Sequence, residues 1–446
     1  MIAPLLRGLF ESLLRLYYPD IAVDGRGHVP AAGPVVVVLN HPNALLDPLL
    51  LRVALGRPVR FLGKSTLFHN PVSRAVMNAF GGIPVHRHRD KAAGADPAQN
   101  ELTFARCRET LAGGGWIALF PEGTSHSDPT LKPLKTGAAR IALSALDAHP
   151  EAAALVVLPA GLYYEHKSTF RSRVLVRFGP PLPVAPRLAA YRDDPRGAVD
   201  ALTDTMREAL DRVVLQADTQ GLLENVARVA VWASDAPDAR DDLATRHRRA
   251  QALLDAHRSW SERDPARVAQ VVDAAQRYTR ILQGLGIDDP WSLEAAEATP
   301  ARVLWAAMKL AALAPFALVG VVLGWAPYRL AGRVAARVAG TEDELGTVKL
   351  LAGALFVLLA WVLEAAAVGF VFGPLAALGL LLLAAPCGYA ALRFEERWDA
   401  LRKARQAVAL RRRHVDVARA VAQRRRELAA ALDEALRVPE SSGEAR

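Results

Sequence analysis

The chain has 446 residues, of which 52% are hydrophobic, and it carries a formal net charge of +9. This length allows more than one domain at roughly 150 residues each, and the basic balance favours an anionic partner, either a nucleic acid or a membrane surface. Its two cysteines, Cys107 and Cys387, lie far apart, which argues against a disulfide scaffold and a cysteine-based zinc site.

The first predicted element is an amphipathic helix over residues 1–20. Arg7, Glu11 and Arg15 follow one another at intervals of four, so they share one helical face, and apolar residues cover much of the remaining surface. Two interpretations stay open for this helix. It packs on the following domain, or it lies in a membrane interface.

Residues 21–216 alternate short apolar strands with helical segments, the pattern of an α/β domain. Several strand candidates are continuous apolar runs, as expected for strands covered on both faces. We therefore predict a mixed, mostly parallel sheet with helices on both faces. The strand candidates are 34–39, 58–62, 83–85, 116–120, 155–161 and 173–178, and the helix candidates are 48–55, 71–80, 98–112, 134–147 and 197–216.

Two charged regions flank the apolar part of the chain. Residues 217–300 are rich in alanine, arginine and aspartate with helical periodicity, so we expect a helical insert with solvated charges. Residues 394–446 read as a long charged helix and tail, either solvated or on a membrane surface. After Phe394, Trp398 is the only aromatic residue of this tail. Because binding of single-stranded nucleic acid uses aromatic stacking platforms, we expect no nucleic-acid partner.

Residues 301–393 form the apolar block. Residues 310–327 carry no charge, and Glu364 is the only charged residue in 350–392. A spanning helix needs about 20 apolar residues, so the second run is long enough to cross a membrane twice, with its break at Gly373-Pro374. We therefore predict a C-terminal transmembrane helical region with a hairpin over 350–392.

Basic residues constrain the membrane topology of this region. They follow the first apolar run, precede the second and follow it again. The positive-inside rule places such flanks in the cytoplasm, so the middle loop and the tail both belong there. The segment 303–328, which contains Pro315, would then enter and leave the membrane on one face, or lie in the interface.

The first candidate for chemistry is NHPNALLDP, residues 40–48, which follows a run of valines. A histidine that ends a buried strand lies at the carboxyl edge of the sheet, where α/β folds bind ligands. Taken singly, His41 fits a loop histidine and Asp47 fits the N-cap of helix 48–55. Taken together, they fit a general base, because a carboxylate on one ring nitrogen fixes the tautomer and raises the basicity of the other nitrogen.

Polar residues also end the next strands. In GGIPVHRHRDK, residues 81–91, Arg87 suits a phosphate, with a solvated basic loop as the alternative. In the stretch that begins WIALFPEGTSHS at residue 116, Glu122 ends a strand beside Gly123, where an acid is suited to bind substrate hydroxyls. Basic residues that follow and suit an anion are Lys132, Lys135 and Arg140.

These blocks, with the proline-containing run VVLPAG at 156–161, resemble the four sequence blocks of the glycerolipid acyltransferases, in the same order over residues 35–180. Two features depart from the common pattern. One extra residue separates His41 from Asp47, and Ser125 replaces the usual arginine after Phe-Pro-Glu-Gly-Thr. In both features, and in the stretch LKPLKTGAARIAL, the sequence resembles the fungal-type glycerol-3-phosphate acyltransferases and their bacterial relatives.

The resemblance implies a mechanism in which His41, oriented by Asp47, deprotonates a hydroxyl of glycerol-3-phosphate, and the oxygen attacks an acyl thioester. It also implies three binding groups. The phosphate group comprises Arg87, with support from Lys135, Lys64 or Arg140. The glycerol group comprises Glu122, Gly123 and Thr124. The acyl-donor group comprises Pro159 and Gly161.

The expected partners follow from this resemblance. Acyl-CoA or an acyl carrier protein serves as co-substrate, anionic membrane lipids bind the basic flanks, and neither a cofactor nor a metal is needed. Lysophosphatidate is the alternative acceptor, and a non-catalytic membrane scaffold with an inactive acyltransferase-like domain is an alternative of another class. We expect the cell (inner) membrane as the location, with the catalytic domain in the cytoplasm.

Overall fold

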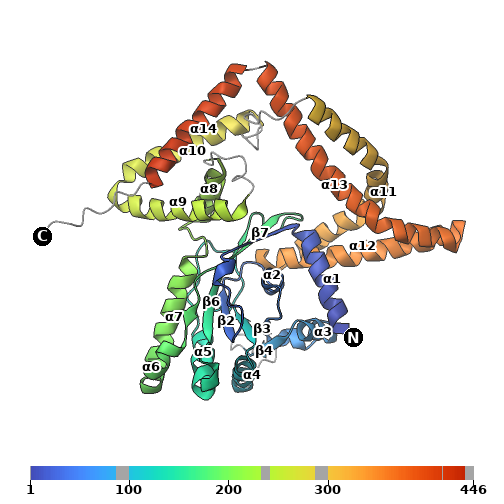
Figure 1. Ribbon diagram of the computed structural model, residues 1–446. Coiled ribbons are helices and arrows are strands. Elements are labelled where there is room, and N and C mark those ends of the chain that lie inside the picture. The colour runs from blue at the N-terminus through green and yellow to red at the C-terminus, as the bar shows by residue number, and fades with distance from the viewer. Residues whose placement is uncertain (1, 87–99, 233–241, 287–299, 414, 437–446) are drawn as a thin grey trace. The chain divides into compact units, whose positions relative to one another are not determined.

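A computed structural model of the chain describes residues 2–86, 100–232, 242–286, 300–413 and 415–436 (Figure 1). The chain divides into two compact units. The first comprises Met1–Leu223 with Ala339–Leu350, and the second comprises Glu224–Val338 with Leu351–Arg446.

The first unit is built on an eight-stranded sheet in the order β1-β7-β6-β2-β5-β3-β4, with β8 paired to β6. All pairs are parallel except β6 with β7 and with β8, so the predicted mixed, mostly parallel sheet is confirmed. The strands are β1 (Asp20–Asp24), β2 (Val35–Leu39), β3 (Arg60–Lys64), β4 (Gly82–Val85), β5 (Trp116–Leu119), β6 (Val156–Tyr164), β7 (Arg173–Phe178) and β8 (Leu182–Pro183).

Helices cover both faces of this sheet, as predicted. Val35 and Val37 of β2 face a core shared with α1 (Ile2–Tyr17), α2 (Leu46–Leu55) and α3 (Pro71–Ala79). Val36 and Val38 face the opposite core, shared with α4 (Asn100–Ala112), α5 (Gly137–Ala148) and α7 (Pro195–Asp211). Because β2 is buried on both faces, its uninterrupted valine run carries no polar alternation.

Helix α1 packs on the first unit along one side. Phe10, Leu14 and Tyr17 belong to its core, whereas Leu5 and Leu9 are 75% and 48% exposed. The first of the two interpretations of this helix is therefore confirmed, and its outer leucines are left facing away from the core.

Three local predictions need correction. The edge strand β1 was not expected, because its sequence DIAVD has no continuous apolar run. Strand β6 extends three residues beyond the predicted end at 161, through Tyr164. Helix α2 begins at Leu46 with Leu45 as its N-cap. Asp47 therefore lies inside the first turn, and the prediction that it is the N-cap is wrong.

The second unit confirms a helical insert within its described residues. Helices α9 (Leu243–Arg263) and α10 (Pro265–Gly284) follow α8 (Gln220–Trp232) and pack against α14 (Val415–Leu436). Arg425 of α14 is only 5% exposed, and Arg267 of α10 donates a hydrogen bond to the Glu434 carbonyl. The tail was predicted to be solvated or on a membrane surface, whereas α14 buries one face among these helices.

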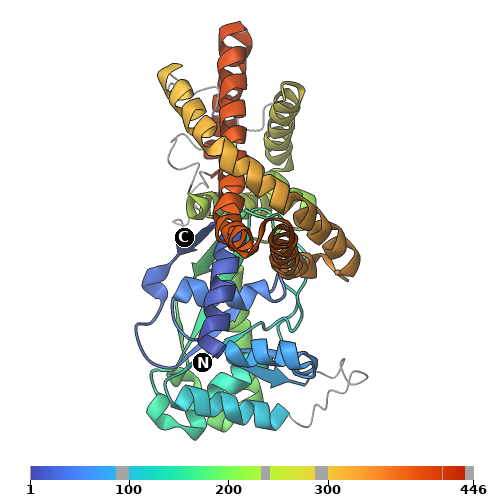
Figure 2. The ribbon, with the colours of Figure 1, turned by 90° about the vertical axis from the view of Figure 1, so that its right-hand side faces the viewer.

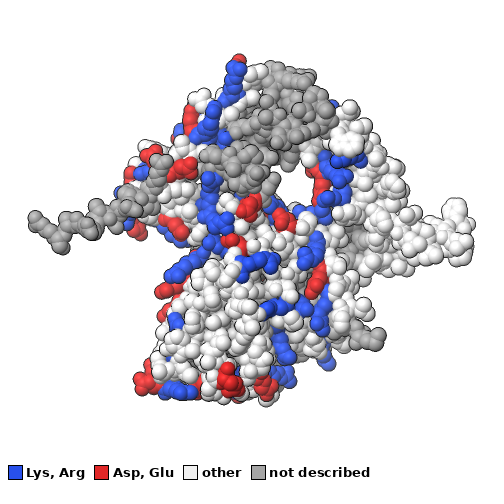
Figure 3. Space-filling model, viewed as in Figure 1, with Lys and Arg blue, Asp and Glu red and all other residues white. Residues whose placement is uncertain are grey.

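Among the described residues, three helices are long and apolar enough to cross a membrane, namely α11 (Pro300–Val338), α12 (Glu342–Phe372) and α13 (Pro374–Arg413). Gly373, at a φ of +88°, separates α12 from α13 at the predicted break, and α13 packs along α11 (Figure 1; Figure 2 gives the view turned by 90°). The turn between α12 and α13 shows no charged residue (Figure 3).

Helix α11 differs from one expectation. It continues through Pro315 and Pro327 as a single helix of 39 residues. A turn inside 303–328 that would return the chain to its starting face is therefore absent from this described segment. The alternative, an interfacial location, stays a prediction.

Candidate active site

The loop after β2 brings His41 and Asp47 together. Asn40 exchanges two hydrogen bonds with the backbone of Leu162 on β6, at 3.1 and 2.8 Å, which fixes where the loop begins. His41 Nδ1 then lies 2.7 Å from Asp47 Oδ2. The His41 ring stacks on Phe120 at a centroid separation of 3.8 Å. The predicted contact between the two side chains is confirmed, and the extra residue is absorbed in the turn before α2.

The carboxylate of Asp47 is fully buried and accepts three hydrogen bonds. Oδ2 accepts from His41 and, at 2.7 Å, from the backbone N–H of Asn43. Oδ1 accepts from the hydroxyl of Tyr164, at 2.5 Å. Burial, followed by the nearby charge of Asp47, raises the pKa of Tyr164 well above its usual range, so this phenol is a neutral donor.

This geometry assigns the two nitrogens of His41. Ionised Asp47 can only accept, so Nδ1 carries the proton that is donated to Oδ2. Nε2 is then the basic nitrogen, and the side chain remains 18% exposed. The pair therefore has the form of a general base, in which a buried carboxylate orients an imidazole that a substrate can reach.

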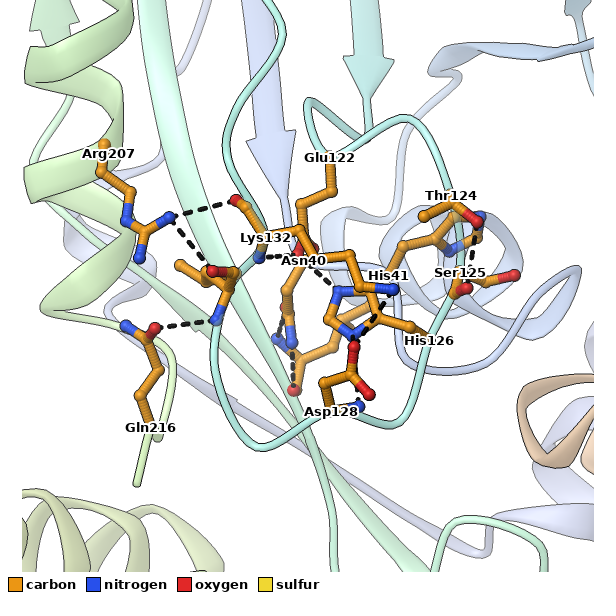
Figure 4. Close-up of polar contacts among 12 residues, drawn as sticks. Asn40, His41, Glu122, Thr124, Ser125, His126, Asp128, Lys132, Arg207 and Gln216 are labelled. Carbon is orange, nitrogen blue, oxygen red and sulfur yellow. Dashed lines mark hydrogen bonds and ion pairs between the residues drawn. The ribbon is translucent and has the colours of Figure 1, made fainter. Parts of the chain in front are cut away.

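A second buried carboxylate lies at the end of β5 (Figure 4). Glu122 Oε2 accepts from His126 Nε2 at 2.5 Å and from the backbone N–H of Lys132 at 2.7 Å. The backbone N–H of Asp128 donates to His126 Nδ1, which fixes the tautomer that donates to Glu122. Glu122 Oε1 is buried without a hydrogen-bond partner among the described residues, so it is suited to accept from a substrate hydroxyl.

The loop between Glu122 and α5 explains two more predicted residues. Gly123 has a φ of +72°, and an ideal Cβ there would lie 2.5 Å from Lys135 Nζ. Gly123 thus allows Lys135 to cross directly above its backbone. Thr124 donates to the carbonyl of Ser125, which makes its hydroxyl part of the loop itself. Lys135 is therefore the predicted phosphate ligand that the structure places beside Glu122.

The other predicted binding residues are dispersed. Lys64 ends β3 and is exposed, and Arg87 lies outside the described residues. The Arg140 guanidinium lies 4.8 Å above the Phe104 ring between α5 and α4, and its support for the phosphate stays a prediction.

The two predicted acyl-donor residues lie inside β6. The Pro159 carbonyl accepts from Gly179, and an ideal Cβ on Gly161 would lie 2.2 Å from the Val213 carbonyl oxygen. Gly161 therefore permits close packing of two chain segments, and an acyl-donor role for either residue stays a prediction. Within the described residues, no cluster of three or more His, Cys, Asp or Glu side chains is arranged to hold a metal ion.

Sequence reasoning missed four residues that hold this site. Tyr164 and His126 support the two carboxylates. Tyr18 accepts from the Asn43 side chain and donates to the Lys167 carbonyl, at 3.1 and 2.6 Å. Two signals were present in the sequence. One is the pair Tyr163-Tyr164 near the end of a buried strand, and the other is a histidine four residues after Glu122. Neither signal identifies a partner.

Comparison with known proteins agrees with this geometry. Residues 20–163 match the Acyltransferase family model. Glycerol-3-phosphate O-acyltransferase 1 of Saccharomyces cerevisiae is 28% identical over 58% of this chain and 34% of its own length. A chloroplastic 1-acyl-sn-glycerol-3-phosphate acyltransferase of Brassica napus is 33% identical over 29% of this chain and 35% of its own.

A solved structure, the 1-acyl-sn-glycerophosphate acyltransferase of Thermotoga maritima, aligns with 46% of this chain and 78% of its own at 19% identity and a TM-score of 0.32. The chain spans less than half the length of the yeast and plant relatives. The match to the Acyltransferase family model is confined to residues 20–163, and the relatives of this stretch are named as acyltransferases of glycerol-3-phosphate and of 1-acyl-sn-glycerol-3-phosphate.

Replacing Tyr164 with phenylalanine tests the network around Asp47. The substitution leaves Asp47 Oδ1 buried without its donor, which should lower the free energy of unfolding by about 1–3 kcal/mol. Thermal unfolding of the detergent-solubilised protein measures this change. Tyr163→Phe is the matched control, because adjacent strand residues point to opposite faces of the sheet. Equal shifts for the two variants would contradict a specific role for Tyr164.

Proposed function

We propose that the protein transfers a fatty acyl group from an acyl thioester to a hydroxyl of glycerol-3-phosphate in phospholipid biosynthesis. The observation that carries this proposal is the His41–Asp47 pair, in which the buried carboxylate accepts three hydrogen bonds and leaves one imidazole nitrogen as a base. The acyltransferase domain at 20–163 contains this pair and the Glu122 loop.

The reaction runs in two steps around His41. Nε2 takes the proton of the acceptor hydroxyl as its oxygen attacks the thioester carbonyl carbon. The carbon–sulfur bond then breaks, an ester bond has formed, and the leaving thiolate takes the proton back from the imidazolium. Asp47 stabilises the charged imidazolium between these steps. This route uses proton transfer and positioning, with acyl-CoA or an acyl carrier protein as the thioester.

The acceptor fits beside Glu122. The unpaired Oε1 is suited to accept from a glycerol hydroxyl, and Lys135 crosses Gly123 next to it as a cation for the phosphate. Arg87 stays a proposed partner of the same phosphate. Ser125 after Phe-Pro-Glu-Gly-Thr, a feature similar to the fungal-type glycerol-3-phosphate acyltransferases, favours glycerol-3-phosphate over lysophosphatidate as the acceptor.

We also propose an inner-membrane location with the first unit on the cytoplasmic side. Leu223 and Ala339 belong to that one unit and must lie on the same side of a membrane. Between them, α11 is the one candidate span among the described residues. Each of the two stretches outside the described residues, 233–241 and 287–299, is shorter than the about 20 residues that a spanning helix needs.

A single complete crossing by α11 would separate these two ends of the chain. We therefore place α11 in the interface or in partial insertion, whereas α12 and α13 cross as a hairpin. Basic residues then lie at the cytoplasmic ends of the apolar runs, where they bind anionic headgroups.

Loss of the general base gives a direct test. In the full-length protein in membranes, His41→Ala should lower the rate of acyl transfer by roughly 10²–10⁴-fold, because general-base catalysis contributes about this much. His69→Ala serves as the control, because His69 is an exposed histidine of the same unit. Wild-type turnover by His41→Ala would overturn the mechanism.

The acceptor is identified from the product. Membranes that contain the wild-type protein are incubated with radiolabelled acyl-CoA and either glycerol-3-phosphate or lysophosphatidate, and the lipid product is separated and identified. We expect labelled lysophosphatidate from the first acceptor. Phosphatidate formed only from the second acceptor would reverse the assignment, and transfer to neither would favour the non-catalytic scaffold.

Site-directed labelling tests the topology. Phe372→Cys, at the hairpin turn, should react with a membrane-impermeant maleimide added from outside the cell, and Gly340→Cys should react only in inverted vesicles. The native cysteines are buried and give a low background. Labelling of Gly340→Cys from outside would show that α11 crosses completely.

A further inference from the structure

The beginning of α12 is part of the first unit, although almost two hundred residues separate it from the rest of the catalytic site in sequence. We call residues 341–350 the docking segment. It contacts the loop that carries His41, the loop after β5 and the loop between β6 and β7. Each contact involves a different kind of interaction, and together they suggest a role beyond anchoring the apolar helix.

The first contact is a close approach of backbone to side chain. An ideal Cβ on Gly346 would lie 2.9 Å from Asn43 Oδ1, 3.0 Å from Asn43 Nδ2 and 3.2 Å from Leu46 Cδ1. A side chain at position 346 would therefore have to displace the ends of the Asn43 and Leu46 side chains. Asn43 is fully buried, and its backbone N–H donates to Asp47. The surface of α12 at Gly346 thus contacts Asn43, the residue whose backbone N–H binds the Asp47 carboxylate.

The second contact reaches the loop after β5. The Asp343 side chain is largely buried, and the Ser125 side chain is one of its polar neighbours. Ser125 occupies the position where the resembling family usually has arginine. Here a carboxylate from α12 faces that position, so the position is occupied by an internal contact and presents negative rather than positive charge.

The third contact fixes the segment to the loop after β6. Lys349 Nζ donates to the Ser168 carbonyl at 2.8 Å, and Lys167 donates to Ser127 while lying 3.9 Å from the carboxylate of Glu342. Leu350 is buried in the same core as Leu46 and Leu50. The docking segment is therefore held at both of its ends, with Gly346 between them.

We propose that the docking segment is a positioning element of the catalytic site, which holds Asn43, and through it Asp47 and His41, in the geometry needed for acyl transfer. This inference rests on the proposed function for its consequence in catalysis. Leu351 follows directly and lies in the uncharged run of α12. The same helix that braces the base therefore leads into the membrane, and the reacting hydroxyl is expected to meet His41 near the bilayer surface.

Replacement of Gly346 tests the proposal. Gly346→Val inserts a branched side chain against Asn43 and Leu46, and should lower kcat roughly 10- to 100-fold, as misplacement of catalytic groups does. The KM for the acceptor should stay within about twofold, since the acceptor ligands are untouched. Gly353→Val is the matched control, because Gly353 lies seven residues further on the same face of α12 and its Cβ would meet no described atom within 4 Å.

The pair Ser125 and Asp343 supplies a second measurement. Ser125→Ala and Asp343→Ala should each lower kcat, and the double variant should lower it no further than the more impaired single variant, because both remove one interaction. The assay is run at a temperature where all variants are folded. If the contact had only a structural role, the variants would show a lower unfolding temperature, and the non-additive effect on kcat would be missing.

Two results would overturn the proposal in an active enzyme. One is wild-type kcat for Gly346→Val, and the other is equal loss for Gly346→Val and Gly353→Val, which would place the defect in helix insertion. If the wild-type protein transfers no acyl group, the proposed function fails instead. Docking is then decided by thermal unfolding of the full-length variants. Gly346→Val should lower the unfolding temperature and Gly353→Val should not, and equal unfolding temperatures would refute docking.

Discussion

The site depends on the burial of one carboxylate. A buried carboxylate is costly unless its oxygens accept hydrogen bonds, and Asp47 meets this constraint with donors from His41, Asn43 and Tyr164. The bonds that compensate its burial also fix the His41 ring and its tautomer. Burial and catalytic orientation are therefore two consequences of the same contacts, and each element that supplies a donor is part of the site.

The order of the strands explains why these donors meet. β2 lies between β5 and β6, and all three run parallel, so their carboxyl ends share one edge of the sheet. His41 follows β2, the Glu122 loop follows β5, and Tyr164 ends β6. A hydrogen bond from the His126 backbone N–H to the His41 carbonyl joins the first two at 3.1 Å. The two buried carboxylates are thus held by loops that support one another.

The proposed function makes two different demands on the chain. An acyl chain is stable in a bilayer, whereas a phosphate and a general base need a polar environment. In our proposal α12 meets both demands, because it starts against the loops of the first unit and continues as an uncharged run. This arrangement also accounts for the small residue at Gly346, where the helix backbone approaches a buried amide.

The sequence by itself determined the α/β pattern, the central strands, the pairing of His41 with Asp47 and the break at Gly373-Pro374, because each is written in local periodicity or in spacing over a few residues. Only the tertiary structure decided that Tyr164 binds Asp47 across 117 residues of sequence and that residues 341–350 brace Asn43. Local patterns carry no information on which distant segments become neighbours. The tertiary structure also placed Asp47 inside the first turn of α2, because the helix begins one residue before it, at Leu46.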